Sequence, residues 1–150
     1  MKKSLLIVGA GGFGREVLGW AAENVSVGID WCIGGVLDSN PRSLDQFRLS
    51  YTILGDPQTY QPTENDVFVC AIGDPATRLR VCSDLRARGA RFANIIHRTA
   101  IVGSDVQMGQ GVILCPYSVV TTNVILLHFM KSGVKLSGKL QEQVVEGANS

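Results

Sequence analysis

Short apolar runs separated by polar segments fill the first 97 residues of the chain. Most of these runs show no alternation of apolar and polar positions, which is typical of strands buried on both faces of a parallel sheet. They predict strands at LLIVGA (5–10), WCIGGVLD (31–38), YTILG (51–55), DVFVCAI (66–72) and RFANIIH (91–97).

A first helix is expected at GREVLGWAAEN (14–24), directly after the first predicted strand. The apolar positions of this segment recur at the spacing of one helical face, so this face is predicted to pack against the sheet. The residues on it are Val17, Leu18, Ala21 and Ala22.

A second helix is predicted to begin at Pro75 and to end near Arg88, with Asp74 as its N-cap and Gly89 as its stop. An aspartate accepts hydrogen bonds from the first turn, proline fits the first helical position, and glycine permits the left-handed conformation that ends many helices. Because strands alternate with helices, residues 1–97 are predicted to form a small Rossmann-like α/β domain with a mostly parallel sheet.

Every sixth residue is apolar or small in the next part of the chain. A six-residue period with glycines near the turns is typical of a parallel β-helix, whose short strands stack on those of the next coil. Residues 98–130 are therefore predicted to form the start of a β-helix of hexapeptide repeats. Its two registers are Val102, Met108, Leu114, Val120 and Leu126, and Val106, Val112, Ser118, Val124 and Met130.

This period fails further along the chain. The next positions are Ser132 and Gly138 in one register, and Leu136 and Glu142 in the other. Residues 131–150 are therefore predicted to form an irregular tail. The β-helix is expected to be incomplete, since its coils need neighbours on which to stack.

Charge and cysteine content narrow the classes of partner. The formal net charge is +1 at pH 7, which gives no basis for binding nucleic acid or an anionic membrane surface. No apolar run approaches the roughly 20 residues that a membrane-spanning helix needs.

The four cysteines form no C-x-x-C pair, so we expect no metal site and reduced, buried thiols in a cytoplasmic protein. They are Cys32, Cys70, Cys82 and Cys115.

The glycines after the first predicted strand form the pattern G-x-G-x-x-G, as Gly9, Gly11 and Gly14. Between a strand and a helix, such glycines allow a tight turn and let backbone N–H groups approach a phosphate at the helix N-terminus. Asp38 ends the second predicted strand. It either contacts the hydroxyls or base of a nucleoside, or caps the turn that follows.

The segment AIGDPATR (71–78) offers further candidates, because ligands of open α/β sheets lie beyond the carboxyl ends of the strands. Gly73 and Asp74 follow a central strand, and Arg78 could reach a phosphate from the first helical turn. The alternative is a capped helix with an exposed arginine. His97 and His128 are expected to be structural, since no carboxylate neighbours His97 and the repeat frays at His128.

Several motifs together resemble the sialic-acid O-acetyltransferase family of sugar acyltransferases, which includes enzymes that N-acetylate UDP-4-amino-sugars on the way to bacillosamine. The resemblance covers residues 4 to about 125. It implies a Rossmann-like domain that binds a nucleotide sugar, and a left-handed β-helix that forms a homotrimer and binds acetyl-CoA between subunits. The motifs are, in order, LLIVGAGGFGREV, GGVLD, ILGD, AIGDPATR and IHRTAIVGSDVQMGQGVILCPYSVVTTNV.

The resemblance also implies which residues hold the nucleotide sugar, for which a UDP linkage is expected. The glycine loop would approach the phosphates, the acid after the second strand would contact the nucleoside, and the AIGDPATR motif would line the cleft. These residues are Gly9, Gly11, Gly12, Phe13 and Gly14, then Asp38, then Gly73, Asp74 and Arg78.

The chain departs from the family where the catalytic histidine is expected. Members use this histidine as the general base, and counting hexads puts it near position 140, where the chain has Leu140, Gln141 and Glu142. The expectation is a chain truncated by a frameshift close to Val124, without a catalytic residue, without the acetyl-CoA site and the trimer contacts of the family, and without transferase activity. Two alternatives remain: a small NAD-binding oxidoreductase, and a non-catalytic assembly protein whose unfinished β-helix docks on a partner.

Overall fold

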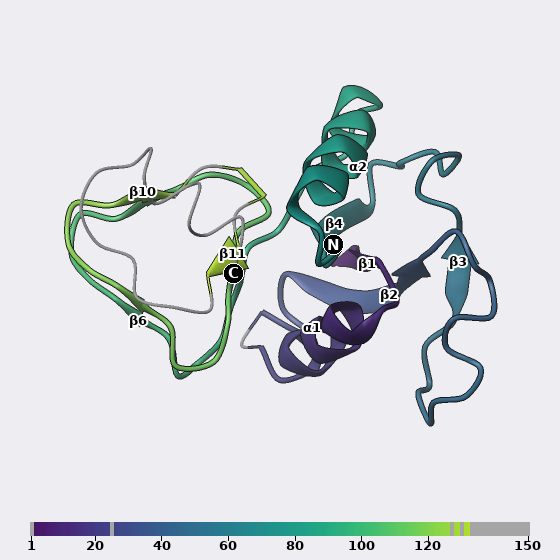
Figure 1. Ribbon diagram of the computed structural model, residues 1–150, viewed down its shortest axis with the longest axis horizontal. Helices are drawn as coiled ribbons and strands as arrows, with labels where there is room; N and C mark the ends of the chain where they lie inside the picture. Colours follow the sequence, from purple (N-terminus) through teal and green to yellow (C-terminus); the bar gives the residue numbers. More distant parts are fainter. Residues whose placement is uncertain (1, 25, 127, 130, 133–150) are drawn as a thin grey trace. The chain divides into compact units, whose positions relative to one another are not determined.

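The computed structural model describes residues 2–24, 26–126, 128–129 and 131–132, and the chain divides into two compact units, Met1–Ala93 and Asn94–Ser150 (Figure 1). The first unit contains β1 (Lys3–Val8), α1 (Gly12–Ala22), β2 (Trp31–Leu37), β3 (Ile53–Gly55), β4 (Asp66–Cys70) and α2 (Pro75–Ala87). The second contains β5 (Ile95–Ile96), β6 (Ile101–Val102), β7 (Gln107–Met108), β8 (Ile113–Leu114), β9 (Val119–Val120), β10 (Ile125–Leu126) and β11 (Lys131–Ser132).

The first unit is built on a four-stranded sheet in the order β3-β2-β1-β4, whose neighbouring strands are all parallel (Figure 1). β1 lies between β2 and β4, and its last four residues are buried, which explains its continuous apolar sequence. The carboxyl ends of the four parallel strands therefore meet at one edge of the sheet.

α1 begins two residues earlier than expected, and its buried face differs by one position. Val17, Leu18 and Ala21 are buried as predicted, but Ala22 is exposed and Gly14 is buried instead. The reason is helical geometry, because Gly14 lies three and four residues before Val17 and Leu18 and so shares their face.

α2 matches its prediction closely. Asp74 is the N-cap, and its side chain accepts a hydrogen bond from the backbone N–H of Thr77. Pro75 is the first helical residue, and Gly89 follows the helix with a φ of +94°. The local signals at both ends of this helix were sufficient to define it.

The single strand predicted at 91–97 is wrong. Phe92 forms an isolated parallel bridge with Phe68 of β4, whereas β5 pairs with β8 in the second unit. One apolar run thus serves two sheets, because the chain leaves the first unit within it.

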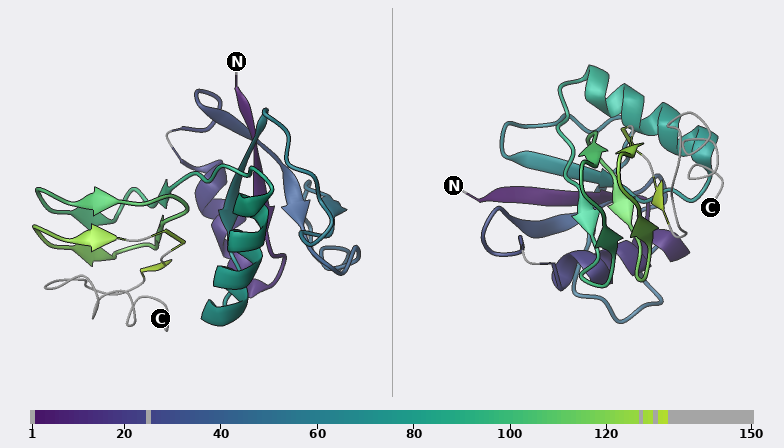
Figure 2. Two further views of the ribbon diagram at one scale, coloured as in Figure 1. Left: turned by 90° about the horizontal axis from the view of Figure 1, so that it is seen from above. Right: turned by 90° about the vertical axis from the view of Figure 1, so that its left-hand side faces the viewer.

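The second unit is a stack of coils with three strands per coil. β5, β8 and β11 form one sheet, β6 pairs with β9, and β7 pairs with β10, all in parallel (Figure 2). Hydrogen bonds between coils, such as that from Gln110 N to Nδ1 of His128, join residues 18 positions apart. The predicted fold class, a Rossmann-like α/β domain followed by the start of a left-handed parallel β-helix, is confirmed.

Apart from Val102, the described residues of both predicted registers are buried in the β-helix or pack against its core. Its core contains Val112, Leu114, Val120, Val124 and Leu126. Ser118 is fully buried, and its hydroxyl donates to the carbonyl of Cys115 at 2.8 Å. Val102, in the first coil of the described stack, is more exposed than its repeats.

The corners of the β-helix repeat one backbone conformation. Every sixth residue has a φ between 56° and 75°, the left-handed region that favours glycine and, to a lesser degree, asparagine and aspartate. The residues concerned are Asp105, Gly111, Tyr117, Asn123 and Phe129. Two aromatic residues therefore occupy positions that their side chains do not favour.

The coil pattern continues past the point where the sequence period weakens. β10 and β11 both follow Val124, and β11 lies in the segment that we expected to be irregular. Backbone pairing needs no apolar side chain, which explains why the ladder extends further than the hexad pattern. The expectations for Met130, for residues 133–150 and for the catalytic histidine near position 140 fall outside the described residues. In the part of the chain that the structure describes, no helix is long and apolar enough to cross a membrane.

Candidate ligand-binding site

The glycine loop joins the carboxyl end of β1 to α1 and approaches both neighbouring strands. Gly9 has a φ of +101°, and its N–H donates to the carbonyl of Leu37 at 2.8 Å. A Cβ at Gly9 would lie 3.1 Å from Cγ1 of Ile72. Glycine is therefore needed here both for its conformation and for the close approach of the segment after β4.

The other glycines of the loop serve different purposes. A Cβ at Gly14 would lie 1.9 Å from the carbonyl oxygen of Gly9, so this glycine lets α1 pack against the loop. A Cβ at Gly11 would meet no atom within 4 Å, and one at Gly12 only the end of the Arg15 side chain. The open space at Gly11 and Gly12 lies at the N-terminus of α1, where no side chain caps the helix.

Asp38 fixes the glycine loop to the segment that follows β2. One carboxylate oxygen accepts from the backbone N–H of Ala10 at 2.9 Å. The other accepts from the N–H of Asn40 at 2.8 Å and from the hydroxyl of Ser43 at 3.1 Å. Asp38 therefore acts as a turn cap, and the residue also lines the cavity described below.

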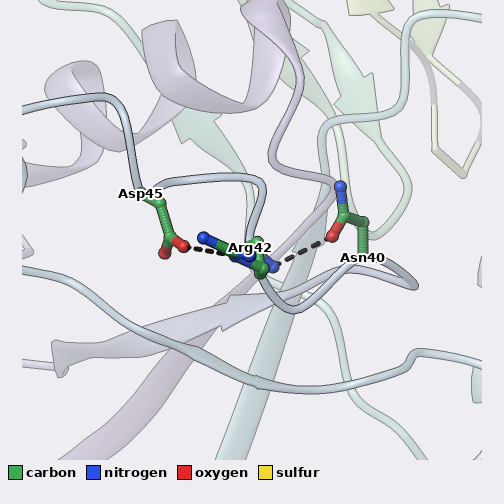
Figure 3. A network of polar contacts seen from close by, with 3 residues as sticks. All are labelled: Asn40, Arg42 and Asp45. Carbon is green, nitrogen blue, oxygen red and sulfur yellow. Dashed lines mark hydrogen bonds and ion pairs between the residues drawn. The ribbon is translucent and has the colours of Figure 1, made fainter.

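Further polar contacts order the connection between β2 and β3. Arg42 donates its backbone N–H to the side-chain oxygen of Asn40 at 3.0 Å, and its Nε to Asp45 at 2.9 Å (Figure 3). The guanidinium of Arg15 donates to the carbonyl of Ala10 and lies over the ring of Phe47, 3.9 Å from its centroid. This connection is thus joined to the glycine loop through Arg15 as well as Asp38.

The predicted residues after β4 form the start of α2 and its support. Asp74 accepts from both the N–H and the hydroxyl of Thr77, and these hydrogen bonds hold the pKa of its carboxyl below the usual value. Arg78 is 3% exposed, and its Nη1 donates to the carbonyls of Ile72 and Gly73 at 3.0 and 3.4 Å. The guanidinium of Arg78 therefore supports the loop between β4 and α2.

A cavity of about 230 Å³ lies at the carboxyl ends of the strands, beside α2. Its walls come from the glycine loop, from the segments after β2, β3 and β4, and from one face of α2. The lining residues used below are Gly9, Asp38, Asp56, Gln58, Thr77 and Arg80. Its position is the one at which open α/β sheets bind ligands.

The predicted site residues divide into two sets around this cavity. Gly9 and Asp38 line it. The other predicted residues do not belong to its lining, namely Gly11, Gly12, Phe13, Gly14, Gly73, Asp74 and Arg78. The side chain of Phe13 packs edge-on against Trp20, with ring centroids 5.9 Å apart.

Sequence reasoning missed Asp56, Gln58, Thr77 and Arg80. Asp56 directly follows the predicted strand at 51–55, so the rule that pointed to Asp38 could have identified it as well. Thr77 and Arg80 are three positions apart in α2, and helical spacing places them on one face. Both residues line the cavity.

A second cavity of about 360 Å³ shares the Pro57–Gln58 segment, Arg80 and Val81 with the first. Arg88, at the end of α2, donates to the carbonyl of Pro57 at 2.6 Å and to that of Tyr60. The hydroxyl of Tyr60 in turn donates to Asp66 at 2.9 Å. Burial and the Asp66 carboxylate raise the pKa of Tyr60 to about 12.

Both histidines of the chain accept a backbone hydrogen bond at the corners of the β-helix. Nδ1 of His97 accepts from the N–H of Thr99 at 3.2 Å, and Nδ1 of His128 accepts from that of Gln110 at 2.8 Å. These contacts give each ring a structural role.

The cysteines are free thiols, and Cys32 differs from expectation. Cys70, Cys82 and Cys115 are buried, whereas Cys32 in β2 is exposed. Burial, and then the neighbouring thiol of Cys70, raises the pKa of the Cys82 thiol. Among the residues that the structure describes, no three histidine, cysteine or acidic side chains gather as a metal site would require.

Comparison with known families gives one match that covers more than half of the chain. The profile of the PglD N-terminal domain matches residues 4–85, a range that includes the glycine loop, Asp38, the cavity and most of α2. A comparison with curated proteins gives no match.

Solved structures with a similar fold include acetyltransferases. The acetyltransferase domain of PglB from Neisseria gonorrhoeae, in complex with acetyl coenzyme A, is 21% identical with a TM-score of 0.73, over 91% of this chain and 65% of that one. PerB from Caulobacter crescentus, in complex with CoA and GDP-perosamine, is 20% identical with a TM-score of 0.58, over 85% and 64%. WeeI from Acinetobacter baumannii is 21% identical with a TM-score of 0.68, over 90% and 62%. The chain thus spans less than two thirds of each of these structures.

Proposed function

The chain belongs to the family of the PglD N-terminal domain, and on this basis we propose that its first unit binds a nucleotide-linked sugar in the cavity beside α2. The observation that carries the proposal is the position of that cavity. It lies at the carboxyl ends of the strands and is lined by Gly9 of the glycine loop and by Asp38, within the range that the family profile matches. The structure of PerB with GDP-perosamine supports a nucleotide sugar as the ligand class.

The predicted residues take distinct parts in this proposal. Gly11, Gly12 and Phe13 lie outside the cavity lining, at the open N-terminal end of α1, and we propose that their backbone N–H groups approach the part of the diphosphate that extends beyond the cavity. Gly9 and Gly14 give the loop the shape that this approach needs. Asp38 holds the loop closed and contacts the nucleoside.

The segment after β4 completes the proposed cleft. Gly73 and Asp74 form its turn into α2, and Arg78 supports that turn from below through the carbonyls of Ile72 and Gly73. We propose that the sugar is UDP-linked, as the family resemblance implies. A GDP-linked sugar is the direct competitor, since PerB was solved with one.

The reaction proposed for the whole protein is acetyl transfer from acetyl-CoA to a sugar amine or hydroxyl. A base removes the proton of the acceptor, the acceptor attacks the thioester carbonyl, and hydrogen-bond donors stabilise the oxyanion before CoA leaves. PglB and PerB were solved with acetyl-CoA or CoA, which supports the donor. We assign the base to none of the described residues, and we propose that the described part of the chain contributes sugar-nucleotide binding.

Thermal unfolding of the chain with a ligand panel tests the proposal. The panel is UDP, a UDP-amino-sugar, GDP, CMP, NAD and acetyl-CoA. A ligand at 100 times its dissociation constant stabilises the folded state by about 2.7 kcal/mol, which raises the midpoint by several degrees for a domain of this size. A shift with uridine nucleotides supports the proposal. A shift with NAD alone refutes it and favours an oxidoreductase. A shift with GDP but not with UDP shows that the nucleotide is a guanosine and not a uridine diphosphate.

A further inference from the structure

We propose that Arg80, and not Arg78, is the cation of α2 that binds the phosphates of the ligand. The inference rests on the proposed function, because it assumes that the ligand is a nucleoside diphosphate or its sugar. The two arginines lie close together in the same helix, so the sequence does not distinguish them. Their surroundings in the fold do.

The guanidinium of Arg78 is engaged in hydrogen bonds to backbone carbonyls. It is almost completely buried, and its Nη1 donates to two successive carbonyls, those of Ile72 and Gly73. The Sγ of Cys70 lies 3.9 Å from the carbonyl oxygen of Arg78, on the side of β4. Turning this guanidinium toward a ligand would leave the turn between β4 and α2 without its donors.

Arg80 belongs to the face of α2 that lines the cavity. Thr77, Arg80 and Val81 are three and four positions apart, so they share one side of the helix, and all three line the cavity. Arg80 is exposed, and its guanidinium takes part in no hydrogen bond or ion pair among the residues that the structure describes. Among the described residues, Arg80 is also the sole arginine or lysine that lines this cavity.

The charges around the cavity make a cation necessary for an anionic ligand. Two carboxylates, Asp38 and Asp56, line the same cavity. Three donors already hydrogen-bond to the Asp38 carboxylate, and one oxygen of Asp56 accepts from the N–H of Gln58 at 2.8 Å. A diphosphate entering here needs a positive charge to offset these acids, and an arginine can bind phosphate with two parallel hydrogen bonds.

Arg80 also lies where the two cavities meet. The second cavity shares Arg80, Val81 and the Pro57–Gln58 segment with the first, and Arg88 holds that segment by donating to the Pro57 carbonyl. A ligand longer than a nucleoside can therefore place its phosphates beside Arg80 from either cavity. This gives Arg80 access to the ligand that Arg78 lacks.

The test measures binding of UDP, GDP and uridine to the whole chain by titration calorimetry, in the wild type and in three variants. Arg80→Gln removes the proposed phosphate contact. Arg86→Gln removes the same charge from an exposed position of the same helix that lines neither cavity. We expect Arg80→Gln to weaken binding of the preferred diphosphate about tenfold or more, as for loss of a charge-assisted hydrogen bond. Arg86→Gln should bind as the wild type does, and Arg80→Lys should lose less than Arg80→Gln.

Uridine separates the phosphate contact from a general loss of the site. Its binding should be the same in the wild type and in Arg80→Gln, because it carries no phosphate. Equal affinity of Arg80→Gln and the wild type for the diphosphate, or an equal loss in Arg86→Gln, overturns the assignment of Arg80 while the proposed function stands. A wild type that binds neither UDP nor GDP overturns the proposed function and this inference together.

Discussion

Replacing Gly14 by alanine tests the close packing of α1 against the glycine loop. The added Cβ would lie 1.9 Å from the carbonyl oxygen of Gly9 and 2.7 Å from its carbon, and both are backbone atoms. No rotamer change relieves this contact, so α1 or the loop must move. Overpacking of this kind costs about 1–3 kcal/mol or more, and we expect the upper end because the neighbour is backbone.

Helix propensity acts in the opposite direction and must be included. Alanine is favoured over glycine inside a helix by about 1 kcal/mol. The net expectation for Gly14→Ala is therefore a loss of about 2 kcal/mol in the free energy of unfolding. This corresponds to a fall of roughly 8–16 °C in the midpoint for a domain of 60–100 residues.

Gly19 provides the matched control in the same helix. It is exposed, and a Cβ there would meet no atom within 4 Å, so Gly19→Ala should raise the stability by about 1 kcal/mol. Urea unfolding followed by circular dichroism measures both variants. A Gly14→Ala protein as stable as the wild type, beside a stabilised Gly19→Ala, would refute the proposed close contact.

Three further outcomes are expected. Tyr117 is 81% exposed with a φ of 60°, so Tyr117→Gly should be about 1 kcal/mol more stable to urea than Tyr117→Ala, and equal stability would contradict left-handed strain at this corner. The raised pKa of Tyr60 means that its contribution to stability is present below pH 10 and is lost as the pH rises through about 12. One tyrosine should thus ionise late in an ultraviolet titration, and Tyr60→Phe should remove that late phase but no earlier one. Asp74→Ala should lower the midpoint of thermal unfolding by removing the N-cap. Asp74→Ser should retain most of the stabilisation, because serine is also a favoured N-cap. Because the pKa of Asp74 is lowered, its contribution is present at neutral pH and lost in acid, so the midpoints of the wild type and of Asp74→Ala should converge at low pH, whereas the serine cap of Asp74→Ser does not titrate and should keep its advantage over alanine.

Local signals in the sequence predicted the elements whose boundaries are set locally. Asp74, Pro75 and Gly89 fix α2 by their own backbone preferences, and β1 is recognisable because a central parallel strand has apolar side chains on both faces. The segment 91–97 was wrongly predicted as one strand. Its composition does not indicate that its first half pairs with β4 of the first unit and its second half with β8 of the second.

The candidate site was less predictable from the sequence than the fold. The glycine loop and Asp38 follow from their position after strands, but the choice between Arg78 and Arg80 depends on the direction in which α2 packs. An N-cap defines where a helix begins and not which face turns toward the sheet. The exposed Arg80 and the buried Arg78 are therefore distinguishable only in the folded chain.

In the β-helix too, one feature could be predicted from the sequence and another could not. Its inward registers follow from the apolar period, but the left-handed corners do not, since glycine occupies just one of the five positions with positive φ from Asp105 to Phe129. Asp105 and Asn123 are weak signals for this conformation, and Tyr117 gives none. Stacking of the coils imposes the corner geometry on whichever residue lies there.

The constant spacing of the β-helix ladder implies that the two units gain their structure by different kinetic routes. Each short strand pairs with one 18 residues away, so every coil closes a chain segment of equal length and presents an edge on which the next can form. In the first unit, Ser4 must meet both Cys32 and Asp66, and these pairings of unequal and longer range are expected to slow its folding. The second unit can therefore grow coil by coil, while the sheet of the first depends on pairings that close longer segments of chain.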